Sequence, residues 1–265
     1  MHLNINFDQL REVALNGIRR SAVFLGLGVN SARDPRFSDY ELTKITLIRL
    51  VPANADAQVV RGYKKAFEEW IIACGLRELT ETFAIFLDGV HRSCLIMATH
   101  QKEIPPEEAT KSGPAFEWKG IEEKLAKLKT CFGVETQKEK YLVSINRVRN
   151  CFTHRRGLVG RPDVGAEDCL RLQWWGMEMF IQTPNNDVIP IPASFPEEGI
   201  YLKDGGTLCM KFTDRVKEFK LGQLIAISPN DLAEMCFLAQ LATDEILKSA
   251  FNYASKIGIP LRESK

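Results

Sequence analysis

The chain has 265 residues, of which 45% are hydrophobic and 26% are charged, and its formal net charge at pH 7 is +1. This length is enough for one large domain or two modest ones with a hydrophobic core. A net charge so close to zero excludes a protein that coats nucleic acid through overall positive charge, so any such affinity must be local.

The sequence contains seven cysteines and no C-x-x-C pair, so it signals neither a zinc knuckle nor a redox couple. We expect buried, reduced thiols. The first residues lack the basic-then-apolar pattern of a signal peptide, and no apolar run approaches the roughly 18 residues of a membrane span. These features predict a cytoplasmic protein without membrane association.

The first 160 residues have the periodicity of helices. Apolar residues on one face predict a helix from Asp8 to about Leu27, a short helix over Ser38–Val51, two longer helices over 56–73 and 76–101, and an amphipathic helix over Ile121–Thr130. Gly75 separates the two longer helices in this prediction. The prolines and glycines of residues 104–120 predict a loop.

A further helix follows, and its start and end are both marked. Thr136 and Glu139 have the spacing of a capping box. A buried stripe is predicted from the spacing of Tyr141, Ile145, Val148 and Phe152. Gly157 is a typical C-terminal stop, and the cations just before it suit the helix dipole.

The pattern changes to that of strands after about Glu167. Apolar residues alternate from Leu170, and a phase shift at Trp175–Gly176 suggests a β-bulge. Asn185–Asp187 predicts a turn. Residues 200–203 and 207–212 flank Asp204–Gly206 as in a hairpin, and Lys217–Ile227 predicts one or two more strands.

A final helix is predicted from a serine cap and a proline at residues 228–231 and runs to about Ile257. The predicted fold class is therefore mainly α, a helical bundle with a small antiparallel β module inserted before the C-terminal helix. Its parts are a helical bundle over 1–165, the β module over 166–228, and a helix over 229–265 that packs back on the bundle.

The most informative stretch is Arg149–Asn150, followed by His154, at the end of the striped helix. Between Lys138 and Arg161 there are seven basic residues and one acidic residue, Glu139. A histidine transfers protons near neutral pH, and a planar guanidinium binds phosphate. Positive charge attracts a polyanion. Together they predict a ribonuclease site that needs no metal and no cofactor.

This motif resembles the signature of the HEPN superfamily, in which an arginine precedes a histidine by four to six residues near a helix end. The residue after the arginine in that family is often polar, as Asn150 is here. The resemblance covers three motif positions and the architecture of residues 1–160 and 229–260. The β module lies outside the minimal bundle of that family.

The resemblance implies a metal-independent endoribonuclease that acts as a homodimer with a composite cleft. Arg149 would grip the phosphate, Asn150 would orient it, and His154 would move the proton. Attack by the 2′-hydroxyl would leave 2′,3′-cyclic phosphate and 5′-hydroxyl ends. A toxin or defence effector is the role suggested by the family, and an inhibitory partner protein would fit that role.

Helical geometry complicates these assignments. Positions 149 and 154 lie about 140° apart on a helix, whereas Arg147, Asn150 and His154 share one face. Arg147 is therefore a second candidate for the phosphate contact. The substrate-binding set predicted around the catalytic residues is Arg147, Arg155, Arg156 and Arg161.

Other interpretations of the same residues remain open. The charged cluster is also typical of a solvated helix end. A catalytically silent RNA- or nucleotide-binding module, or a protein-interaction module that uses the β strands, would fit the same fold. His91 and His100 are expected in the core or on the surface, and of Trp174 and Trp175 one is expected to be buried and the other exposed.

Overall fold

A computed structural model describes residues 5–36, 56–165, 168–191, 199 and 201–260. The α-helices in these ranges are α1 (Phe7–Arg33), α2 (Ala57–His100), α3 (Pro106–Glu117), α4 (Ile121–Phe132), α5 (Glu139–Arg155) and α6 (Pro229–Lys256). A 3-10 turn, η1 (Arg161–Asp163), and strands β1 (Cys169–Gln182), β2 (Val188–Pro190) and β3 (Thr207–Lys220) complete the elements. The prediction of a mainly helical chain with a small antiparallel sheet before the last helix is confirmed.

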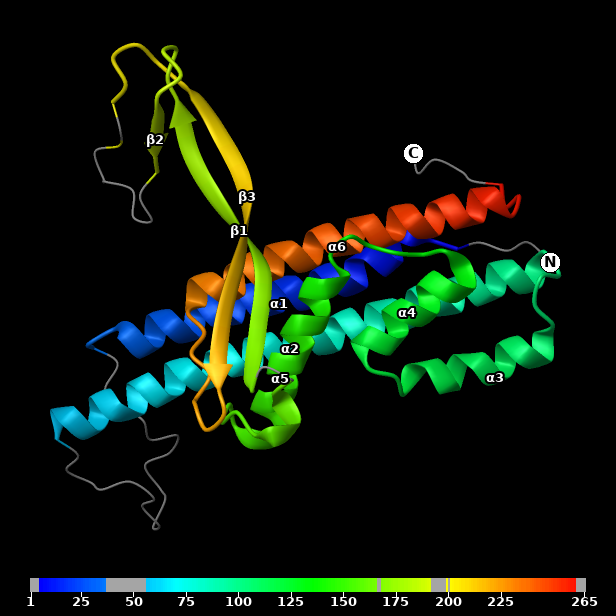
Figure 1. Ribbon diagram of the computed structural model, residues 1–265, viewed down its shortest axis with the longest axis horizontal. Coiled ribbons are helices and arrows are strands. Elements are labelled where there is room, and N and C mark those ends of the chain that lie inside the picture. Colours follow the sequence, from blue (N-terminus) through cyan, green and yellow to red (C-terminus); the bar gives the residue numbers. More distant parts are fainter. Residues whose placement is uncertain (1–4, 37–55, 166–167, 192–198, 200, 261–265) are drawn as a thin grey trace.

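Three long helices, α1, α2 and α6, lie side by side along the molecule (Figure 1). Helices α3 and α4 pack against α2, and α5 lies between α2 and the sheet. The sheet has the order β2-β1-β3. One half of the β1–β3 ribbon packs on α5 and α6, and the other half projects beyond the helices (Figure 1).

Gly75 does not divide α2, which is one helix of 44 residues, so the prediction of two helices is wrong. Gly75 is buried, and a Cβ added there would lie 2.8 Å from Leu232 Cδ2 of α6. A glycine inside a helix costs about 1 kcal/mol relative to alanine. Here it allows close contact with α6, and the burial of the apolar residues around it outweighs that cost.

The segment predicted as a loop contains helix α3. Pro106 stands at the first helical turn, where its missing amide costs nothing. Phe116 is buried at 2% exposure and stacks on His91 with ring centroids 3.8 Å apart. Tertiary packing thus stabilises a helix that contains Pro114 and would be weak in isolation.

Helix α5 begins without the predicted capping box. Its N-cap residue is Lys138, which makes no side-chain cap bond. The Thr136 hydroxyl instead donates to Glu245 of α6 at 2.5 Å. The apolar stripe is confirmed, because Tyr141, Ile145 and Val148 are buried and Phe152 packs against the core at partial exposure.

Strand β1 contains no bulge, because its register with β3 is unbroken from Cys169↔Lys220 to Gln182↔Thr207. The phase shift in the sequence has another cause. Leu172 and Trp174 face the core, whereas Met177 and Met179 lie on the opposite face, in the projecting half of the ribbon, and are each 38% exposed.

The predicted hairpin around Asp204–Gly206 is also wrong. Residues 201–203 form no strand, and β3 pairs with β1. The turn before β2 and the serine cap of α6 are confirmed. The predicted helix over Ser38–Val51 lies outside the described residues.

Trp174 and Trp175 face opposite sides of β1, as expected for neighbours in a strand. Trp174 is buried and its indole donates to Glu234 at 2.6 Å. Trp175 is half-buried rather than exposed: its ring stacks on Phe212, and Lys138 Nζ lies 3.9 Å from its centroid. Neither ring is open for base stacking.

Candidate functional site

The C-terminal turns of α5 present the predicted motif. The face opposite the buried stripe carries Arg147 and His154, which are exposed, and Asn150, which is half-buried. The helix ends at Arg155, and its C-cap residue, Arg156, has a left-handed φ of 51°. The Gly157 amide then donates to the Cys151 carbonyl at 3.3 Å, so the backbone closes this turn with few free carbonyls.

A cavity of about 420 Å³ lies against this face. Helix α5 contributes Arg147, Asn150, His154 and Arg155 to its lining, and η1 with the residues after it contributes the opposite wall, 162–165. The volume lies within the roughly 300–1,000 Å³ of small-ligand sites. The face predicted from helical geometry is therefore the face that lines the cavity.

Arg149 is not part of that lining. Its Nε donates to Thr80 Oγ1 of α2 at 3.2 Å, and its Nη1 donates to Asn150 Oδ1 at 3.1 Å. Because a guanidinium only donates, the amide oxygen of Asn150 must face Arg149. The amide nitrogen of Asn150 is left with two donors for another acceptor, so Arg149 acts on the cavity through Asn150.

Arg155 is held by the wall of the cavity. Its Nε lies 2.5 Å from Asp163 Oδ2, its Nη2 contacts the other carboxylate oxygen, and the Gly160 amide donates to the same carboxylate at 2.9 Å. The Asp163 side chain is 3% exposed. Burial raises the pKa of this carboxyl, but these hydrogen bonds outweigh burial and hold the pKa below its usual value. The pair fixes η1 against α5 rather than offering a free cation.

Two further arginines of the predicted substrate-binding set also have acidic partners. Arg147 lies 3.2 Å from Glu122 of α4, and Arg161 lies 3.0 Å from Asp168. Both pairs are exposed, and such pairs contribute roughly 0–1 kcal/mol, so an anion can compete for the arginine. Arg156 alone of the four has no carboxylate partner among the residues that the structure describes.

These acidic partners were missed because they lie outside the sequence window that showed the basic excess. Asp163 and Asp168 follow it by a few residues, and a wider window would have included them. Glu122, the partner of Arg147, and Thr80, the hydroxyl partner of Arg149, are far away in sequence, and no local signal indicates them. The positive charge near His154 is therefore smaller in space than along the chain.

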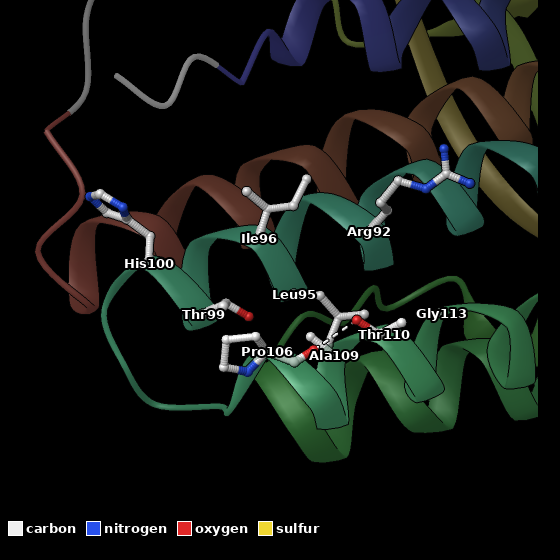
Figure 2. A pocket seen from close by; sticks show the side chains of 9 residues that line it. All are labelled: Arg92, Leu95, Ile96, Thr99, His100, Pro106, Ala109, Thr110 and Gly113. Carbon is white, nitrogen blue, oxygen red and sulfur yellow. Dashed lines mark hydrogen bonds between the residues drawn. The ribbon is translucent and has the colours of Figure 1, made fainter. Parts of the chain in front are cut away.

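The other histidines are separate from this site. His91 is buried, and burial, with help from Lys127 and Lys124, lowers its pKa from 6.5 to about 4. His100 is exposed at the rim of another cavity, which lies between the end of α2 and α3 (Figure 2). Leu95, Pro106 and Ala109 make that cavity largely apolar, and its titratable lining residues are Arg92 and His100.

No three His, Cys, Asp or Glu side chains gather in a possible metal-binding group within the described residues. Over the same residues, no helix has the length and apolarity needed to cross a membrane. The seven cysteines are free thiols, and the expectation of burial holds for three of them, Cys94, Cys151 and Cys236. Cys74, Cys169 and Cys209 are half-buried, and Cys131 is exposed.

Comparisons with protein-family models, with curated proteins and with solved structures found no match.

Proposed function

We propose that this protein is a metal-independent endoribonuclease of the HEPN type, with its catalytic site at the C-terminal end of α5. The observation that carries this proposal is the cavity lined together by Arg147, Asn150 and His154, with Arg149 bound to Asn150. A proton-transfer group beside cationic and amide donors is the set that phosphate transesterification requires.

In this mechanism the neutral His154 accepts the proton of a 2′-hydroxyl. The 2′-oxygen bonds to the adjacent phosphorus, and the bond from phosphorus to the 5′-oxygen breaks. The 5′-oxygen then receives a proton from the imidazolium, so the histidine is restored. Arg147 binds the phosphate, the Asn150 amide stabilises the charge that develops on the non-bridging oxygens, and Arg149 keeps Asn150 oriented.

The exposure of His154 leaves room for a second copy of the chain at the same face. A homodimer that meets there would form one cleft with two histidines, so that one could act as base while the other acts as acid. A toxin or defence effector in the cytoplasm, held silent by an inhibitory partner over this face, is the biological role that we propose with the HEPN type.

A silent RNA- or nucleotide-binding module is the second candidate. The observation that favours it is the engagement of the arginines: Arg149 is bound to Thr80 and Asn150, and Arg155 is bound to Asp163. Such a module would keep the cavity and hold a phosphate without cleaving RNA.

A protein-interaction module would instead use the exposed Met177 and Met179 of the ribbon.

Cleavage of a defined RNA in EDTA separates these candidates. The nuclease cuts the RNA and leaves 2′,3′-cyclic phosphate ends, and it spares a matched strand whose scissile nucleotide carries a 2′-deoxyribose. Binding without cleavage would support the silent module. Equal cutting of both strands would contradict the attack by the 2′-hydroxyl.

A further inference from the structure

A second cavity lies on another side of the α5 C-terminus and has a volume of about 740 Å³. Its walls are α2 over 69–77, the last turn of α5 and the segment 224–227 that leads into α6. Thr153 and Arg156 line this cavity, whereas His154 and Arg155 line the candidate catalytic one. Thr153 and His154 are neighbours about 100° apart around the helix, so the two cavities lie on adjacent sides of the same turn of α5.

One wall of this second cavity offers an aromatic surface. Trp70 lines it and is 60% exposed, with Phe67 beside it at a centroid separation of 6.2 Å and an interplanar angle of 21°. Trp70 forms a stacked pair with Phe67 and lines a cavity, which distinguishes it from a singly exposed residue such as Trp118. Stacking on aromatic side chains is the sequence-tolerant way in which proteins hold unpaired bases.

The same cavity has two cations. Arg77 is exposed, and its Nε lies 3.7 Å from Oε1 of Glu81, one turn along the same helix. Arg156 has no carboxylate partner among the described residues, and its left-handed backbone is strained for a residue with a side chain. Its guanidinium lines the cavity and is available to a phosphate.

Glu69 is the acidic group of the lining. Its carboxylate lies 4.0 Å from Nζ of Lys65, one helical turn away. A carboxylate accepts hydrogen bonds from the amino groups on base edges. The cavity thus combines three features: an aromatic surface for stacking, a carboxylate that accepts hydrogen bonds from a base, and two arginines that donate hydrogen bonds to a phosphate.

We propose that this second cavity binds one nucleotide of a single-stranded RNA, with its base on Trp70 and its phosphate between Arg77 and Arg156. This inference rests on the proposed function, because the bound nucleotide flanks the scissile phosphate at His154. The cavity gives the enzyme a subsite for unpaired RNA, in which Arg156 contacts the phosphate.

The test is the affinity of the full chain for a fluorescent 12-nucleotide 2′-O-methyl RNA, which lacks the attacking hydroxyl and stays intact. Trp70→Ala weakens binding roughly 5- to 100-fold, and Trp70→Phe retains most of the affinity. Trp118→Ala is the matched control, because Trp118 is 92% exposed at the end of α3 and lines neither cavity, and binding should be unchanged. Arg156→Gln reduces the slope of log K against log salt by about 1.

The outcomes distinguish this inference from the proposed function. Unchanged affinity in Trp70→Ala, while the wild-type protein still cleaves ordinary RNA, overturns the subsite alone. Absence of any RNA binding by the wild-type protein overturns the subsite and the nuclease together. Equal losses in Trp70→Ala and Trp118→Ala would also contradict a specific subsite, and circular dichroism of each variant checks that it is folded.

Discussion

The two ends of α5 differ in the burial and the pairing of their polar side chains. At the N-terminal end, Lys138 is 4% exposed, lies 2.8 Å from Glu245 and stands over the ring of Trp175. At the C-terminal end, His154 is exposed, and Asn150 lines a cavity with an amide nitrogen that has no acceptor within the part of the chain that the structure describes. Polar groups that are buried and paired fix the fold, whereas polar groups with free donors beside a cavity are available for a ligand.

The largest expected effect comes from the stripe that joins the two ends. Val148 is fully buried, and Val148→Asp would place a carboxylate in the core. We expect loss of the folded state, measured as loss of the cooperative urea transition in circular dichroism. Val143→Asp is the matched control at a partly exposed position of the same helix, and it should remain folded.

The N-terminal end should respond in stability. Lys138→Met removes the buried cation that pairs with Glu245, whose own side chain is 35% exposed, and leaves Glu245 with the Thr136 hydroxyl and the Gln137 amide. We expect a loss of about 2 kcal/mol in the free energy of unfolding, as for a hydrogen bond to a charged group, measured by urea denaturation. RNA cleavage per folded molecule should not change. A stability close to that of the wild-type protein would mean that this network does not hold α5 against α6.

The C-terminal end should respond in rate. Arg149→Ala frees the Asn150 amide to rotate, and we expect kcat to fall on the order of 100-fold, as for loss of one oriented donor. Arg147→Ala removes an exposed cation from the cavity and should mainly raise KM. Steady-state kinetics on a short RNA separates the two effects, and an unchanged kcat in Arg149→Ala would contradict its positioning role.

His91 gives an effect that appears only below neutral pH. Its pKa is about 4 in the folded protein and about 6.5 in the unfolded chain, so the unfolded state binds more protons between these values. Stability should therefore be full well above pH 6.5 and fall by about 3 kcal/mol as pH drops to 4. Urea midpoints across this range measure the loss, and His91→Phe should flatten the profile.

Local patterns predicted the parts of this molecule that depend on neighbours in sequence. The apolar stripe of α5, the cap of α6 and the shared face of Arg147, Asn150 and His154 follow from helical spacing alone. Each uses residues within a few turns of one another, and each is present in the structure.

The features that the sequence did not predict depend on distant partners. Gly75 has the appearance of a helix break in the sequence, but it lies inside α2, where it allows close contact with Leu232. Thr136 has the spacing of a capping residue, but its hydroxyl donates to Glu245. The hydrogen bond from Arg149 to Thr80 joins residues that are 69 positions apart in the sequence. No local pattern encodes such contacts, because they arise only when the helices pack.

The comparison of the two ends depends most on His154. The decisive measurement is the rate of RNA cleavage in EDTA by His154→Ala, beside His100→Ala as a control that removes an exposed histidine at another cavity. We expect His154→Ala to lose roughly 100- to 10,000-fold in rate at unchanged stability, with His100→Ala equal to the wild-type protein. Cleavage retained in His154→Ala would contradict the catalytic role of the α5 C-terminus.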